Sequence, residues 1–131
     1  MKSINIEEKF TKFSKNWHPH QIAVVDNMQV ILAKLKGEFV WHSHDDEDEL
    51  FQVIKGTLYM QFRASSSEAD EGGIRTEVVK QGEIIVVPKG VEHNPFTKNN
   101  EEVHVLLFEK LSTTHTGKIQ HDKTQTHYPK I

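Results

Sequence analysis

Short apolar runs separated by turn residues dominate the chain from residue 22 onward. They span four to nine residues and end near Gly, Asn, Asp or Pro, which is typical of β-strands rather than helices. About nine strands are expected on this basis, at 22–25, 28–36, 39–44, 49–54, 57–63, 74–80, 83–87, 91–96 and 103–110. This number predicts an all-β fold, closed as a small barrel or a two-sheet jelly roll.

The N-terminal residues carry a helical pattern instead. Asn5 can cap a helix, with Glu8 as its reciprocal partner three residues later. Aromatic residues then recur at intervals of three and four, the spacing of one helical face, at Phe10, Phe13 and Trp17. Pro19 marks the end of this pattern, so a short helix packed on the barrel is expected.

These patterns divide the chain into a helical arm at 1–20, a β-barrel at 21–111 and an irregular polar surface strap at 112–131. No internal repeat is visible, which predicts one barrel rather than a fused pair. Residues 64–73 have two adjacent glycines and no apolar periodicity, so they predict a mobile hairpin loop. Such a loop is more typical of a tolerated insertion than of a lid.

Composition narrows the class of protein. The 131 residues suit a single domain, and 16 basic against 19 acidic residues give a formal charge of −3. Neither sign forms the long stripe expected of a protein that binds nucleic acid or a membrane surface, so no such partner is expected. The chain has no cysteine, no apolar run long enough to span a bilayer and no start resembling a signal peptide, which predicts a cytoplasmic location.

Candidate metal ligands gather near one expected strand. His42 and His44 are two residues apart in the strand 39–44, so both imidazoles would project from one face toward one ion. Glu49 would open the next strand after an acidic turn, with Glu47 as the alternative carboxylate if the register shifted. Imidazoles and a carboxylate suit divalent iron, manganese, nickel, zinc or copper.

Two motifs in this region resemble those of the cupin superfamily. The first motif has a glycine, His-x-His, a glutamate and a second glycine, here Gly37, His42, His44, Glu49 and Gly56. The second motif is Gly82, Pro88, Gly90 and His93, in a segment that reads GEIIVVPKGVEH. The sequence departs from the family pattern at two positions. Gly37 lies one residue closer to the first histidine than usual, and Thr97 replaces a frequent asparagine.

The resemblance covers residues 37–97 and extends, through the flanking segments, to small bacterial single-domain cupins of the mannose-6-phosphate isomerase-like group. It implies a cupin double-stranded β-helix, a jelly-roll barrel, with a short N-terminal helix. It also implies one divalent metal ion per chain (Fe, Mn, Ni or Zn), held by His42, His44, Glu49 and His93. Catalytic acids and bases are not identified.

Cupins include dioxygenases, isomerases, decarboxylases, sugar-binding modules and storage proteins, so the fold leaves several functions open. The first expectation is an enzyme of dioxygenase or isomerase type that acts on a small metabolite at the metal. The second is a non-catalytic cupin that binds a small sugar or carboxylate. A third treats the metal as a structural staple, which a closed tetrahedral site without a cavity would favour.

The other aromatic and histidine residues carry weaker expectations. His104 alternates with Val103 and Val105 on a late strand and could point into the barrel, as could Tyr59. The remaining histidines lie in polar or proline-bounded segments and are expected to face solvent: His18, His20, His115, His121 and His127.

The first ligand strand also predicts an oligomer. Alternation would place Phe39, Trp41 and Ser43 on the face opposite His42 and His44. A large aromatic on the outer face of a barrel needs cover, which the N-terminal helix or a second subunit would supply. We therefore expect a homodimer.

Overall fold

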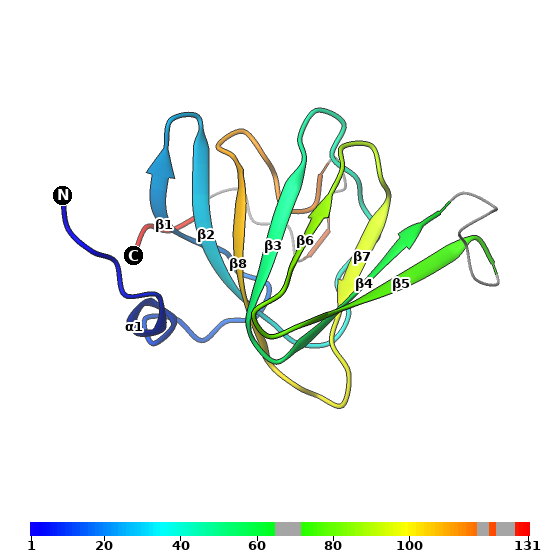
Figure 1. The fold of residues 1–131 in the computed structure, drawn as a ribbon, viewed down its shortest axis with the longest axis horizontal. Coiled ribbons are helices and arrows are strands. Elements are labelled where there is room, and N and C mark those ends of the chain that lie inside the picture. Colours follow the sequence, from blue (N-terminus) through cyan, green and yellow to red (C-terminus); the bar gives the residue numbers. More distant parts are fainter. Residues whose placement is uncertain (65–71, 118–120, 123–127) are drawn as a thin grey trace.

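The computed structural model describes residues 1–64, 72–117, 121–122 and 128–131. It contains one short helix, α1 (Ile6–Phe10), and eight strands within these ranges (Figure 1). The strands are β1 (His20–Val25), β2 (Met28–Leu35), β3 (Glu49–Lys55), β4 (Thr57–Arg63), β5 (Ile74–Lys80), β6 (Ile84–Val87), β7 (His93–Phe96) and β8 (Val103–Lys110). None of the helices in the described part is long and apolar enough to cross a membrane.

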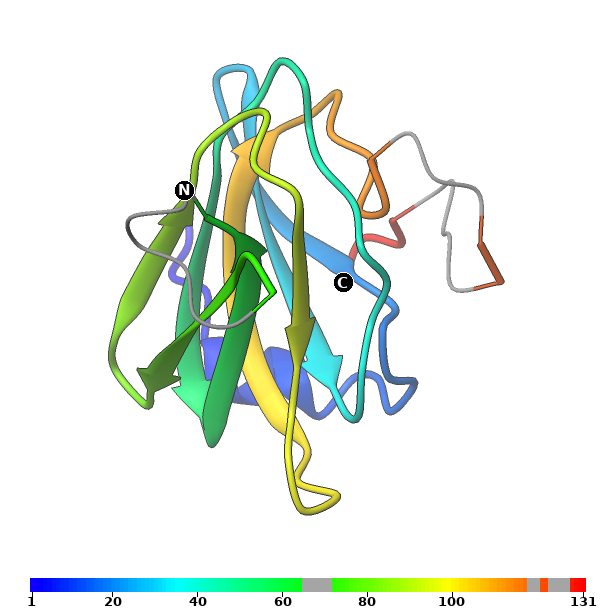
Figure 2. The same ribbon diagram turned by 90° about the vertical axis from the view of Figure 1, so that its right-hand side faces the viewer.

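The strands form two antiparallel sheets. One sheet has five strands in the order β1-β2-β8-β3-β6, and the other has three in the order β5-β4-β7. Their apolar faces enclose the core, so the predicted all-β jelly roll is confirmed. The chain between β2 and β3 and the chain after β8 lie on one side of the barrel, drawn in teal and in orange to red (Figure 2).

The centre of the larger sheet is a regular ladder between β2 and β8. Eight consecutive residues pair without a break, from Met28 with Lys110 to Leu35 with Val103. Side chains along each strand alternate across the sheet, and those facing inward, such as Ile31 and Val105, are fully buried. These inward positions join residues of β3 and β4 in one apolar core.

The regular strands lie close to where the sequence predicts them. The bounds of β4, β5 and β8 match the predicted ones to the residue. The hairpin between β4 and β5 is also confirmed, because the Ala64 amide donates to the Gly73 carbonyl at 3.1 Å where the two strands meet. The loop predicted at 64–73 otherwise falls on residues 65–71, outside the described residues.

The N-terminal helix begins as predicted and ends early. The Asn5 side-chain oxygen accepts from the Glu8 amide at 3.0 Å, which confirms the cap. The helix ends at Phe10, so the prediction of one helical face carrying all three aromatic residues is wrong. Phe10 and Phe13 still contact each other, with ring centroids 5.8 Å apart. Each of the three rings also stacks on a residue of the barrel or its loops: Phe10 on His104, Phe13 on His20 and Trp17 on Phe39. Packing on the barrel therefore overrides the helical spacing.

The predicted strand at 39–44 is wrong. This segment pairs with β7 through isolated bridges, at Glu38 with Phe96 and at His42 with His93, rather than through a continuous ladder. Between the bridges, the Phe39 amide donates to the Pro95 carbonyl at 3.1 Å. Four steps along the segment therefore lie opposite three along β7, so one extra residue is accommodated as in a β-bulge. This extra residue turns Phe39 inward together with His42, whereas strict alternation would separate them.

Trp41 points outward as predicted, but the N-terminal helix does not cover its ring. The Arg63 guanidinium lies over its ring at 4.7 Å. Phe10 and Phe13 pack elsewhere, so the helix does not cover Trp41.

The chain after β8 is more deeply buried than a surface strap. Thr113, His115 and Thr116 are at most 8% exposed. At the end of the chain, the Gln21 amide donates to Pro129 at 2.8 Å and the Ile131 amide donates back to Gln21 at 3.1 Å. The C-terminus therefore runs beside the edge strand β1.

Candidate metal centre

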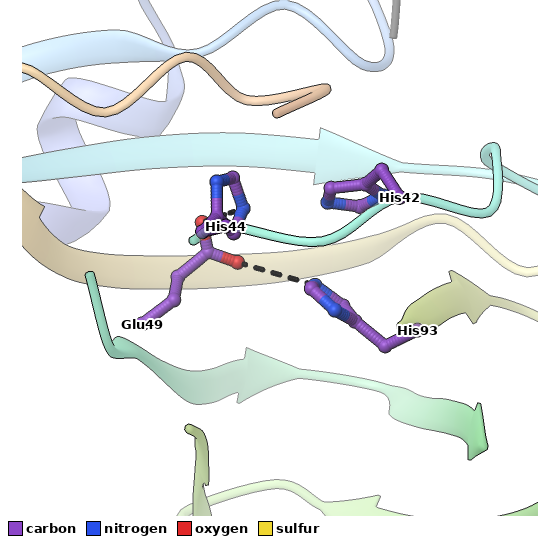
Figure 3. A group of neighbouring side chains, drawn as sticks. All are labelled: His42, His44, Glu49 and His93. Atoms are coloured by element: carbon purple, nitrogen blue, oxygen red, sulfur yellow. Dashed lines mark ion pairs between the residues drawn. The ribbon is translucent and has the colours of Figure 1, made fainter. Parts of the chain in front are cut away.

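Four side chains converge inside the barrel from three parts of the chain (Figure 3). They are His42 and His44 in the bulged segment, Glu49 at the start of β3 and His93 at the start of β7. Each is at most 5% exposed. One donor atom from each lies within 4.8 Å of all the others, so all four residues predicted as ligands come together.

Backbone carbonyls orient two of the imidazoles. Nδ1 of His42 lies 2.8 Å from the Val40 carbonyl, and Nδ1 of His93 lies 2.9 Å from the Val91 carbonyl. A carbonyl only accepts hydrogen bonds, so each Nδ1 carries the proton and each Nε2 keeps its lone pair. In both cases the partner is two residues earlier, which couples the ring orientation to the local backbone.

Two of the ligand nitrogens are placed to bind a metal ion. His44 Nε2 and His93 Nε2 are buried and have no hydrogen-bond partner in the described structure. Both lie near Glu49, His44 Nε2 at 3.2 Å from Oε2 and His93 Nε2 at 3.8 Å from Oε1. Leaving buried polar atoms without partners is costly, and a divalent cation would satisfy these nitrogens and the carboxylate together.

The residues of the cluster differ in their tendency to carry a charge. Burial alone would raise the pKa of Glu49, but the His44 and His93 imidazoles hold it well below its ordinary value. Burial opposes the charged form of His44 as well, yet the neighbouring Glu49 carboxylate raises the pKa of its imidazole. Burial lowers the pKa of His42 to about 3. The protein without metal therefore holds Glu49 ionised and His42 neutral.

A second buried acid lies behind the first. Glu109, on β8, is fully buried, and Gln29 Nε2 donates to its Oε1 at 3.5 Å. Burial and the charge of Glu49 raise the pKa of Glu109 well above its ordinary value, so its carboxyl group is neutral. The cupin motifs do not contain this residue. The alternation of β8 does reveal it, because Glu109 shares the inward face with Leu107.

A cavity of about 30 Å³ adjoins the cluster. His42 and Glu49 form part of its wall, and Trp17 and Phe39 stack in another part with ring centroids 4.6 Å apart. Apolar residues supply most of the remainder: Pro19, Ala33, Leu35, Phe51, Pro95 and Leu107. The last lining residue is His115, from the segment after β8.

Several predictions about individual side chains need correction. His104 does not point into the barrel, because it stacks on Phe10 and bonds Glu102 at 3.0 Å on the outer face. Tyr59 is also outside, stacked on Phe96. His20 and His115 are buried, so the prediction that they face solvent is wrong.

The other histidines and the alternative ligand are placed as follows. His18 is half-buried and His121 is exposed, while His127 lies outside the described residues. Glu47 is half-buried in the turn before β3 and does not belong to the four-residue cluster, which contains Glu49. Thr97, in the place of the frequent asparagine, accepts from the Gly37 amide at 2.8 Å and so fixes the turn before the ligand segment.

Known proteins resemble the chain in sequence and in fold. YdbB, an uncharacterised protein of Bacillus subtilis, is 34% identical over 88 residues, which are 67% of this chain and 64% of YdbB. A cupin-2 domain protein of Shewanella frigidimarina has a solved structure with a TM-score of 0.71 and 40% identity, over 82% of this chain and 93% of that one.

A larger enzyme shares the fold alone. Hydroquinone 1,2-dioxygenase of Sphingomonas, solved with 4-nitrophenol, is 17% identical with a TM-score of 0.69, over 85% of this chain and 33% of that one. The sequence model of the cupin domain matches residues 28–109, which include both motifs and all four clustered residues. The chain therefore belongs to the cupin family.

Proposed function

We propose that His42, His44, Glu49 and His93 hold one divalent metal ion (Fe, Mn, Ni or Zn) and that a small metabolite reacts there, in a reaction of dioxygenase or isomerase type. One observation carries this proposal. Four buried donors lie within 4.8 Å of one another, and two of their nitrogens have no hydrogen-bond partner among the described residues. Without an ion, these two nitrogens would have the Glu49 oxygens, at 3.2 Å and 3.8 Å, as polar neighbours.

The adjoining cavity favours an open site over a structural staple. A bound divalent ion would supply Lewis acidity or, if it is iron, redox chemistry, and four protein donors leave up to two of six octahedral positions free. Glu49 and His42 line the cavity, so a ligand in it reaches the cluster directly. A closed tetrahedral site would have no need of such a space.

The surrounding residues would hold the site ready. The Val40 and Val91 carbonyls fix the protonated nitrogens of His42 and His93, so both rings are oriented before an ion arrives. The stacked rings of Trp17 and Phe39 exclude water from one wall of the cavity. Neutral Glu109 adds no second negative charge beside Glu49.

Dioxygenases are among the proteins that share this fold. Two solved relatives of the fold are hydroquinone 1,2-dioxygenases, one solved in complex with Fe3+. At 17% and 13% identity they share the fold alone, so their substrate is not transferred to this chain. A non-catalytic cupin that binds a small sugar or carboxylate uses the same residues and is separated from an enzyme only by turnover.

The test begins with metal analysis of protein purified without chelators or a metal-affinity tag. About one ion per chain is expected, and Glu49→Gln should retain the fold and bind metal more weakly, because it removes the charge and keeps one oxygen. Oxygen uptake by the iron-loaded protein, measured with a panel of small metabolites, then distinguishes an oxygenase from a binder. Cooperative unfolding on chelation at room temperature would instead identify the ion as a structural staple.

We also propose that the protein acts as a homodimer in the cytoplasm. The support for the dimer is the outward, half-buried ring of Trp41. Phe39 no longer supports a dimer, because it is 8% exposed and lines the cavity.

A further inference from the structure

The C-terminal segment, residues 113–117, is built into the wall of the cavity. His115 is 8% exposed and lines the cavity together with the clustered residues His42 and Glu49. Its ring centroid lies 5.4 Å from that of Phe39, which lies 5.4 Å from that of His42. Phe39 therefore contacts both histidines, and His115 lines the cavity without belonging to the four-residue cluster.

Close backbone packing fixes this segment in place. Gly117 has φ +60°, and a Cβ atom added there would stand 2.1 Å from the Ser43 carbonyl oxygen. Thr116, next to it, is fully buried. Since Ser43 lies between His42 and His44, the segment carrying His115 packs directly on the backbone of the ligand segment.

The lining defines the chemistry of an occupant. Three neutral imidazoles, one carboxylate and a divalent ion would carry a net charge of +1 in a buried place, which a monoanionic ligand cancels. Beside this charge the wall is mostly aliphatic and aromatic, so the rest of the ligand is apolar. At about 10–15 Å³ for each water, the cavity of about 30 Å³ holds about two or three water-sized groups. With the carboxylate at the cluster, it admits a chain of about one to three further carbons.

We propose that the cavity takes short-chain monocarboxylates of about two to four carbons and that His115, which contacts Phe39 in the cavity wall, is a specificity-determining residue that limits their length. The assignment rests on the proposed metal centre and adds the ligand class and the residue that sets it. Because His115 acts through its volume, its removal should lengthen the accepted chain rather than abolish binding.

The test uses the full chain loaded with cobalt(II), whose visible absorption reports ligands that reach the ion. Formate, acetate, propionate, butyrate, hexanoate and octanoate are titrated in turn. The wild type should bind acetate to butyrate best, with hexanoate about tenfold weaker because it overpacks the cavity. His115→Ala should remove most of this penalty, while His104→Ala, which deletes a histidine on the outer face, should leave the profile unchanged.

Two further variants separate volume from loss of structure. His115→Phe keeps a ring in the wall and should keep the preference for short chains. Gly117→Ala should move the segment away from Ser43 and admit hexanoate as His115→Ala does. If His115→Phe lengthens the accepted chain as much as His115→Ala does, the effect is detachment of the segment and the role given to His115 is wrong.

The outcomes also distinguish this inference from the proposed function. Failure of the wild-type chain to bind cobalt overturns both. Bound cobalt with no response to any carboxylate, or with the same profile in the wild type and His115→Ala, overturns only the ligand class and the role of His115.

Discussion

The β2–β8 ladder and the segment 38–44 differ in how regularly their backbones pair with a neighbouring strand. The ladder pairs eight residues in succession, and its strict alternation sends every second side chain into the core. The segment 38–44 makes only isolated bridges, and between them the five residues 38–42 stand opposite the four residues 93–96. Alternation spreads side chains along a line, whereas a metal centre needs them at one point. Regular pairing therefore builds the stable core, and irregular pairing lets the ligand side chains meet at one point.

The largest effect that would test this division is loss of the clustered ligands. His42→Ala combined with His93→Ala should reduce metal affinity by more than about 100-fold, because even the loss of an outer partner costs about 10- to 100-fold. The ladder is untouched, so the apo variant should keep the far-ultraviolet circular dichroism of the wild type. Metal analysis after dialysis measures the effect. Stoichiometry still near one per chain would show that the four residues do not form the centre.

The converse experiment damages the ladder and spares the ligands. Ile31 is fully buried on the inward face of β2, and Ile31→Ala should lower the free energy of unfolding by about 3 kcal/mol, through lost burial and the cavity left behind. Metal stoichiometry should remain that of the wild type. Urea denaturation of the apo proteins gives the first quantity and metal analysis the second. A variant that loses metal while still folded would contradict the separation of the two regions.

The same two regions show what a sequence can predict. In the ladder, side-chain period and strand period coincide, so the bounds of β8 follow from the pattern alone. Around the metal centre, the motif indicates which residues are the ligands. A bulge interrupts the alternation of side chains, so the inward position of Phe39 could not be predicted. His115 lies far from both motifs in sequence, and its role depends on the close approach of Gly117 to Ser43, which no local pattern encodes.

The pH dependence of metal binding tests whether His44 is a ligand. A metal must displace the proton of His44, whose pKa Glu49 raises above its ordinary value of about 6.5. Affinity should therefore be full above that raised pKa and fall about tenfold per pH unit below it, for one displaced proton. His42 does not compete, because burial lowers its pKa to about 3. Equal affinity at about pH 5 and pH 8 would contradict ligation by His44.

The smallest expected effect concerns the outer face of the irregular segment, where the bulge leaves Trp41 half-buried under Arg63. If this face joins two copies of the chain, Trp41→Glu should convert a dimer into a monomer at micromolar concentration in sedimentation velocity. The monomer itself should lose less than about 1 kcal/mol, because a cation–π contact at such a site is worth about 0.5–1 kcal/mol and the new carboxylate can pair with Arg63. Val24→Glu places the same charge on β1, where Val24 is 51% exposed, and should leave the dimer intact. A wild-type monomer would reject the dimer outright, while dissociation by both variants would trace the effect to added charge rather than to the face that carries Trp41.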